Sequence, residues 1–156
     1  RINDDLGHDT GDAVLVSVAR RLEAAVGSEG SVARWGGEEF LVFLPGADED
    51  ATRRLSERLR QEQTEPVIVG ERRVSATISI GYCNLPIAGT RGPEAWNYSL
   101  QLADASLYLA KDAGRDAWVG VWLTNTIPDW PPERLASEFR NAYAAEVLAV
   151  TSSRPL

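Results

Sequence analysis

Apolar residues recur along this chain at two spacings, and the alternation between them predicts an ordered series of helices and strands. Between residues 12 and 26 they return every three or four positions, which predicts an amphipathic helix that ends at Gly27. Residues 31–34 and 40–44 predict the two arms of a hairpin. The second arm is continuously apolar, so we expect it to be buried. A second helix is predicted from Asp48, which can cap it, to about residue 63.

The middle of the chain predicts a further hairpin, a helix and a strand. Residues 67–69 and 74–82 predict a second hairpin, whose longer strand alternates apolar and hydroxyl side chains and should bury one face. Residues 93–113 predict a third helix, with a proline at a first helical position and a glycine at its end. The residues expected on its inward face are Trp96, Leu100, Ala103, Leu107 and Ala110. A closing strand is predicted over residues 117–122.

Beyond the closing strand the composition changes. We expect residues 1–122 to form one domain and residues 123–156 to form a C-terminal extension. Apolar anchors at helical spacing predict one amphipathic helix over residues 132–150, and residues 151–156 are expected to be a frayed tail. Helices that alternate irregularly with antiparallel strands predict an α+β fold, an antiparallel sheet flanked by helices with an extra helix at the C-terminal end.

The charge of the chain limits the partners that it can bind. The 156 residues carry a formal net charge of −7, which argues against general binding to nucleic acid or to an anionic membrane. No apolar run reaches the length of a membrane span, and the single cysteine, Cys83, allows no internal disulfide. We therefore expect a cytoplasmic domain that contacts neither nucleic acid nor membrane. The chain starts without a methionine, which indicates a part of a larger protein.

The run Arg34-Trp35-Gly36-Gly37-Glu38-Glu39-Phe40 predicts a tight bend that carries two carboxylates. Paired glycines allow positive φ and let the backbone approach a bulky ligand. Neighbouring carboxylates repel each other unless a cation lies between them, and Mg²⁺ binds through one or two carboxylates together with substrate phosphates. A solvent-exposed acidic turn is the alternative, and the run alone leaves both open.

Two further segments carry polar side chains that could bind a ligand. Asn3 and Asp12 flank a polar stretch that we expect to form a short turn before the helix. A carboxylate can accept hydrogen bonds from N1–H and the 2-amino group of guanine while an amide donates to a ring acceptor. Taken alone, turn and capping chemistry is the preferred interpretation. Lys111 and Arg115, four residues apart at a helix end, can point at one anion, although cations there also suit the helix dipole.

These segments resemble, in order and in spacing, the motifs of the GGDEF family of diguanylate cyclases. The matching segments are residues 3–12, 34–40, 77–81 and 103–115, and the resemblance covers about residues 1–121. It implies a fold similar to the nucleotidyl cyclases and the polymerase palm. It also implies a reaction that condenses two GTP into cyclic di-GMP and two pyrophosphates, with one GTP in each domain of an antiparallel homodimer.

The resemblance assigns the guanine and backbone contacts to five residues of this chain. Asn3 and Asp12 would recognise guanine, and Leu15, about one helical turn beyond Asp12, would form the wall of the pocket. Gly36 and Gly37 would lie close to the nucleotide.

The resemblance also assigns the groups that act on the phosphates. Glu38 would bind Mg²⁺ or Mn²⁺, and Glu39 would be a further metal ligand or would help to activate the 3′-hydroxyl. Lys111 and Arg115 would hold the terminal phosphates. Alignment and charge neutralisation are the main needs of such a transfer, and this assignment supplies both.

The chain departs from the family pattern in three places, one of which is that residues 125–156 lie outside the motif set. The family has an Asp-x-Asp-x-Phe-Lys strand just upstream of Asn3, and its absence here predicts a piece that is weakly active or inactive on its own. The family's Arg-x-x-Asp product-inhibition pair falls on Gly27 and Gly30, so we expect no such site. Arg54 and Arg58 match positions that assist product binding in relatives, with a solvated helix face as the preferred alternative.

Two rival functions stay open at this stage. A catalytically silent GGDEF module could bind GTP or cyclic di-GMP as a receptor. The second rival function is that of a scaffold that only dimerises. Retention of both Glu38 and Glu39 favours the enzyme, because a pocket that only binds nucleotide has no need of two repelling carboxylates.

Overall fold

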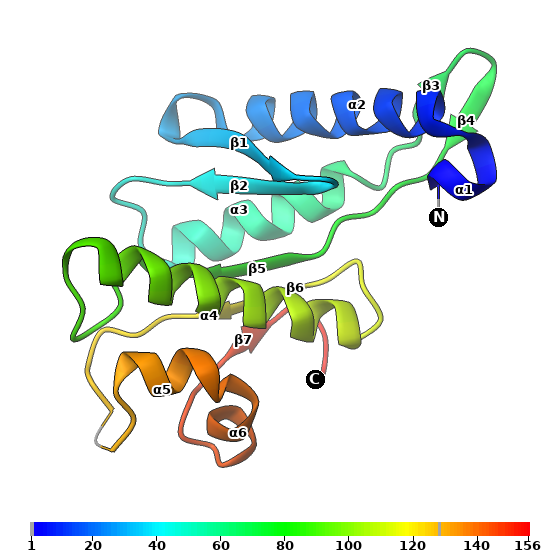
Figure 1. Ribbon diagram of the computed structural model, residues 1–156. Helices are drawn as coiled ribbons and strands as arrows, with labels where there is room; N and C mark the ends of the chain where they lie inside the picture. Colours follow the sequence, from blue (N-terminus) through cyan, green and yellow to red (C-terminus); the bar gives the residue numbers. More distant parts are fainter. Residues whose placement is uncertain (1, 128) are drawn as a thin grey trace. The chain divides into compact units, whose positions relative to one another are not determined.

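The computed structural model describes residues 2–127 and 129–156, and the chain divides into two compact units. The first unit comprises Arg1–Ala47 and Arg54–Thr77, and the second comprises Asp48–Arg53 and Ile78–Leu156. Helix α3, Glu49–Glu62, passes from the second unit into the first. Both helices and strands occur in each unit (Figure 1), so the predicted α+β class is confirmed.

The first unit begins with two helices where the pattern predicted a turn and one helix. Helix α1 spans Ile2–Leu6 and helix α2 spans His8–Val26, with Gly7 between them at φ 86°. The Thr10 hydroxyl donates to the Leu6 carbonyl at 2.9 Å and joins the two helices. The prediction of a polar turn up to Asp12 is wrong because residues 2–11 contain few apolar side chains, so their helicity leaves no hydrophobic period to detect.

Helix α2 packs on β1 of the first hairpin, and the strands of this hairpin are less buried than predicted. Strands β1, Ser31–Gly36, and β2, Glu39–Phe43, pair antiparallel. The apolar run of β2 is half-buried over residues 40–42, and Phe43 is 45% exposed. The prediction of a buried strand is wrong because, among the residues that the structure describes, this sheet has two strands.

Helix α3 forms as its sequence signals predict. The Asp48 carboxylate accepts a hydrogen bond from the Ala51 amide at 2.7 Å, which is the predicted cap, and Leu55 and Leu59 are buried. After α3, strands β3, Val67–Val69, and β4, Arg72–Val74, form the second hairpin.

The predicted long strand over residues 74–82 is two strands with separate partners. Strand β4 ends at Val74, and strand β5, Ile80–Cys83, begins after five residues without strand structure. Strand β5 pairs parallel with β6, Trp118–Val121, and β6 pairs antiparallel with β7, Thr151–Ser152. The parallel pair differs from the antiparallel sheet that was predicted. It is possible because α4, Gly92–Asp112, supplies the long crossover that parallel strands require.

Helix α4 turns a different face inward from the one that was predicted. Proline occupies its first turn, as expected, and α4 packs on β5 and β6. Its buried residues are Ala95, Ser99, Leu102, Ser106 and Ala110. Trp96 is 38% exposed, so the predicted face is about one residue out of register. Two buried serines caused the error, because an apolar pattern skips them.

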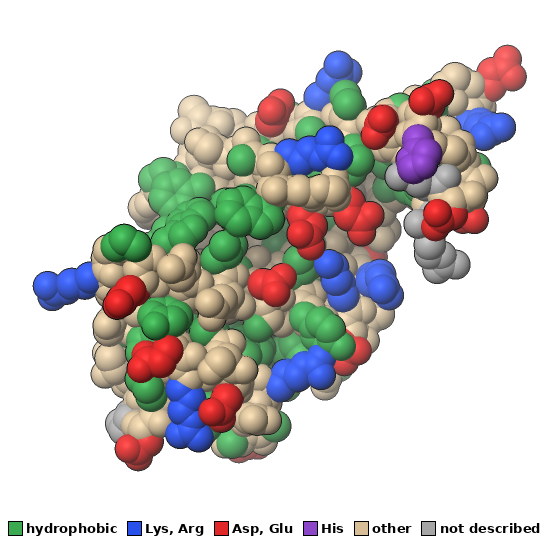
Figure 2. Space-filling view, viewed as in Figure 1, with side chains coloured by type: hydrophobic (Ala, Val, Ile, Leu, Met, Phe, Trp, Pro, Cys, Tyr) green, Lys and Arg blue, Asp and Glu red, His purple; other side chains and the backbone are tan. Residues whose placement is uncertain are grey.

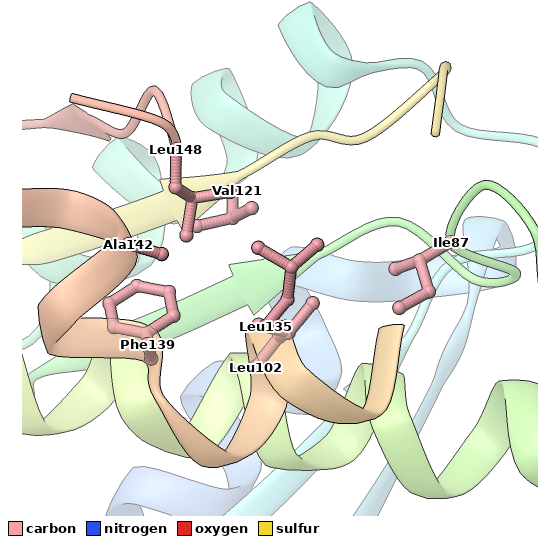
Figure 3. Packing of buried hydrophobic residues seen from close by; sticks show 7 residues of the cluster. All are labelled: Ile87, Leu102, Val121, Leu135, Phe139, Ala142 and Leu148. Atoms are coloured by element: carbon pink, nitrogen blue, oxygen red, sulfur yellow. The ribbon is translucent and has the colours of Figure 1, made fainter. Parts of the chain in front are cut away.

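The C-terminal segment is part of the second unit and packs on its helix α4 and strand β6. Helices α5, Pro132–Ser137, and α6, Phe139–Ala144, replace the single predicted helix, and Glu138 separates them. The residues that they bury pack with β6 and α4 in one cluster (Figure 3), whose members are Ile87, Leu102, Val121, Leu135, Phe139, Ala142 and Leu148. The predicted frayed tail is also wrong, because β7 pairs with β6.

Candidate functional site

The candidate residues divide between the two compact units. The hairpin bend and helix α2 belong to the first unit, and the end of α4 belongs to the second.

The bend between β1 and β2 presents both carboxylates to solvent. Gly36 pairs with Glu39 across the hairpin, so Gly37 and Glu38 form the two-residue connection. Gly37 has φ 49°, a conformation that glycine adopts without strain, and it stands at the first central position. Glu38 and Glu39 are both exposed.

The space above the two glycines is open. A Cβ built at Gly36 or at Gly37 meets no heavy atom within 4 Å among the described residues. Gly36 also lacks a left-handed φ, so neither packing nor backbone conformation excludes a side chain there. The bend therefore leaves room for a ligand to approach the backbone.

Arg34 stabilises this bend, a role that the sequence patterns did not identify. Its Nε and Nη2 atoms both donate to the Gly37 carbonyl, at 3.0 and 2.6 Å. The strand register shifts between Arg34 and Gly36, and this irregularity lies directly before the bend. The signal available in the sequence was an arginine three residues before the second glycine of the pair.

The acidic pair fits a divalent ion only as part of a larger ligand set. Glu38 and Glu39 supply carboxylate oxygens, the ligand type that Mg²⁺ and Mn²⁺ prefer. Within residues 2–127 and 129–156, no group of three or more His, Cys, Asp or Glu side chains is placed to hold a metal. Two carboxylates that share Mg²⁺ with phosphate oxygens would match this donor set.

Helix α2 holds two of the three residues expected to form the guanine site. Asp12 is exposed and Leu15 is half-buried, and their spacing of three places them on the same side of the helix. Asn3 lies within α1, and its side chain lies outside the part of the chain that the structure describes. The guanine-binding roles of these three residues stay predictions.

Helix α4 ends between the two cations expected to bind phosphate. The helix ends at Asp112, so Lys111 lies in its last turn and Arg115 lies beyond it. The Arg115 amide donates to the Ala110 carbonyl at 3.2 Å across Gly114, which has φ 101°. This is the usual way in which a glycine ends a helix. Gly114 ends the helix, as predicted, and the chain turns there. That Lys111 and Arg115 can point at one anion stays a prediction.

The turn after α4 contains backbone strain. Arg115 has φ 63° and Asp116 has φ 45°, and each left-handed residue other than glycine costs about 1–2 kcal/mol. Such residues persist only when surrounding contacts hold them. An ion pair between Arg154 Nη2 and Asp116 Oδ2, 3.0 Å apart, is one such contact.

Other motif positions have structural roles in this chain. At Gly30, an added Cβ would lie 2.4 Å from the Phe43 carbonyl oxygen, so the position has no room for an aspartate of a product-inhibition pair. Arg58 donates to the Ala25 carbonyl near the end of α2, which favours a structural role. Gly81, which ends the 77–81 motif, lets β5 contact the backbone of α4.

The surface shows charges of both signs. On the face drawn in Figure 2, acidic and basic side chains are interspersed with hydrophobic ones. No helix among the described residues is long and apolar enough to span a bilayer.

Comparison with known proteins identifies the family. A family model described as diguanylate cyclase, GGDEF domain, matches residues 1–117. The chain belongs to this family. The GGDEF domain thus covers both hairpins, the acidic bend and helix α4, and the C-terminal helices and β7 lie beyond the match.

Similar proteins agree with this membership. Diguanylate cyclase DgcP of Pseudomonas aeruginosa is 42% identical over 117 residues, which cover 74% of this chain and 17% of DgcP. The crystal structure of the diguanylate cyclase SiaD of P. aeruginosa, in complex with its activator SiaC, matches with a TM-score of 0.65. It is 36% identical and covers 80% of this chain and 45% of SiaD. An active GGEEF domain from Vibrio cholerae matches with a TM-score of 0.63 and 27% identity, covering 80% of this chain and 73% of that domain. These matches confirm the palm-like fold.

Proposed function

We propose that this domain condenses two molecules of GTP into cyclic di-GMP and releases two pyrophosphates, with one GTP in each domain of an antiparallel homodimer. The observation that carries the proposal is the bend of the first hairpin. It presents Glu38 and Glu39 beside an open glycine backbone, and Arg34 stabilises it. A phosphate-bound divalent ion needs both features, an acidic pair and space for a large ligand.

The acidic pair would hold Mg²⁺ or Mn²⁺ together with phosphate oxygens. The ion, when bound, neutralises phosphate charge and thereby favours attack at phosphorus. Glu38 is assigned as a metal ligand. Glu39 is assigned as a second ligand or as the carboxylate that accepts the proton of the attacking 3′-hydroxyl.

The remaining residues bind and orient the substrate. The Asp12 carboxylate accepts hydrogen bonds from guanine N1–H and the 2-amino group, Asn3 donates to a ring acceptor, and Leu15 forms the pocket wall. Lys111 and Arg115 bind the terminal phosphates and offset the charge of the leaving pyrophosphate. A bond forms between the 3′-oxygen of one GTP and the α-phosphorus of the other, and the bond from that phosphorus to pyrophosphate breaks. The same exchange in the opposite direction closes the ring and releases the second pyrophosphate.

A comparison of matched variants tests the proposal. This chain, and a form extended upstream by roughly twenty residues, enough for one strand and its turn, are incubated with GTP and Mg²⁺. Cyclic di-GMP and pyrophosphate are then measured. Glu38→Ala should lower turnover by orders of magnitude because a metal ligand is lost. Lys111→Ala should chiefly raise KM, by about tenfold.

Gly36→Ala tests the approach of the nucleotide to the bend. The fold accepts a methyl group at this position, since a Cβ meets nothing within 4 Å. The variant should therefore keep its melting temperature and lose affinity for GTP. Absence of GTP binding in both forms of the protein would refute the proposal. So would full turnover by Glu38→Ala. A form that binds GTP and makes no product would be the receptor module instead.

A further inference from the structure

We infer that the C-terminal strap, defined as residues 151–154, positions Arg115 for phosphate binding, with Arg154 as the positioning residue. The strap lies outside the family match, which ends at residue 117. The inference rests on the proposed function, because it assigns a support to one phosphate-binding residue of that site.

The strap is anchored along the length of β6. Thr151 and Ser152 pair with Gly120 and Val119. The Tyr82 hydroxyl lies 3.0 Å from the Thr151 hydroxyl, so the strap also contacts β5. Figure 1 shows β7 beside β6, with the C-terminal end of the chain close by.

Beyond β7 the strap reaches the start of β6. The Ser153 amide donates to the Trp118 carbonyl at 3.0 Å, and the Trp118 amide donates to the Ser153 hydroxyl at 2.9 Å. These two bonds fix Trp118, two residues beyond the strained Asp116. The Ala117 carbonyl, one residue earlier, accepts from the Ile80 amide at 2.9 Å.

Arg154 contacts the turn itself. Its Nη2 atom pairs with Asp116 Oδ2 at 3.0 Å, and its Nη1 atom lies 3.9 Å from the position of a Cβ at Gly114. The guanidinium therefore lies against the turn that contains the left-handed Arg115 and Asp116. Two consecutive residues of this kind need external contacts to stay in place, and the strap supplies them.

A simple charge effect and a positioning effect can be separated by two substitutions. Removing the cation in Arg154→Ala would weaken binding of an anion through charge alone, and removing the anion in Asp116→Asn would strengthen it. If the pair positions Arg115, both substitutions weaken binding. Asparagine tolerates left-handed φ, so Asp116→Asn removes the ion pair without adding backbone strain.

The experiment measures the affinity of the 156-residue chain for GTP with Mg²⁺, and hydrogen exchange of the amides of residues 114–118. Arg154→Ala and Asp116→Asn should each weaken GTP binding by about two- to fivefold, the range of an exposed ion pair. The double variant should bind GTP with the same affinity as the single variant that binds it less tightly, because the two residues act as one unit. Arg154→Lys should retain most of the affinity. Exchange at residues 114–118 should become faster in each variant except Arg154→Lys.

Arg134→Ala is the matched control. The Arg134 side chain is 44% exposed, close to the 42% of Arg154, and pairs with Glu138 in the same unit. This variant should leave both GTP affinity and exchange at residues 114–118 unchanged. Unchanged exchange in Arg154→Ala would overturn the inference. Faster amide exchange in Arg154→Ala with unchanged affinity for GTP would overturn it too. The strap would then hold the turn without contributing to phosphate binding.

The failure of the two proposals can be told apart. Absence of GTP binding by both the 156-residue chain and its extended form refutes the proposed function. The exchange measurement would then still decide whether the strap holds the turn. A wild-type chain that binds GTP, with stronger binding by Asp116→Asn, refutes only the positioning role.

Discussion

The contact between β5 and α4 predicts that Gly81→Ala strongly destabilises the second unit. An added Cβ would lie 2.1 Å from the Ala103 carbonyl oxygen and 2.2 Å from the Leu107 amide nitrogen. Both atoms belong to the backbone of α4, so no side chain can rotate away. Real Cβ contacts almost never fall below 3.0 Å, and the helix must therefore move by about 1 Å.

The size of the effect follows from this displacement. Overpacking in a core costs about 1–3 kcal/mol, and movement of a whole helix places Gly81→Ala at the upper end, about 3 kcal/mol. In a chain of this length 1 kcal/mol changes the melting temperature by about 2–4 °C, so a fall of about 6–12 °C is expected. Thermal unfolding followed by circular dichroism measures it.

Gly36→Ala is the control for this prediction. It makes the same chemical change where a Cβ meets nothing within 4 Å and φ is not left-handed. Its melting temperature should stay within about 2 °C of the wild type, because surface substitutions usually change stability by less than about 0.5 kcal/mol. If Gly81→Ala and Gly36→Ala melted at the same temperature, close packing of α4 on β5 would not be the reason for the glycine in the 77–81 motif.

Two further predictions concern buried polar groups. Gln63 is 1% exposed, and neither polar atom of its side chain has a partner among the described residues, so Gln63→Leu should stabilise the fold by about 1–2 kcal/mol. Urea unfolding checks this against Gln61→Leu, an exposed position that should change stability little. Burial raises the pKa of the Cys83 thiol from 9.0 to about 12, so iodoacetamide should label it at pH 8 only after unfolding, and rapid labelling of the native protein would contradict this. Because the folded pKa is the higher one, the contribution of this thiol to stability is complete below pH 9 and is lost as the pH rises toward 12.

The candidate site illustrates what local sequence signals can predict. The paired glycines before Glu38 and Glu39 predicted the bend, because a two-residue connection needs a residue with positive φ and Gly37 supplies it. The role of Arg34 was missed because its hydrogen bonds go to a backbone carbonyl, an acceptor that every residue carries. The change of direction at Arg115 was also missed, since the sequence places a glycine at the helix end without showing where the chain goes next.

The sequence by itself determined the elements whose signals act over a few residues: the cap at Asp48, the bend at Gly37 and the end of helix α4 at Gly114. Only the tertiary structure decided which strands pair and which faces are buried. Strand β6 lies between β5 and β7, whose residues are about 70 positions apart in the chain, and no local pattern specifies such partners. Capping and φ preferences depend on immediate neighbours, whereas strand pairing and burial depend on contacts between distant segments. For that reason the sequence of residues 151–156 predicted a frayed tail, whereas in the structure Thr151–Ser152 form an edge strand of the sheet.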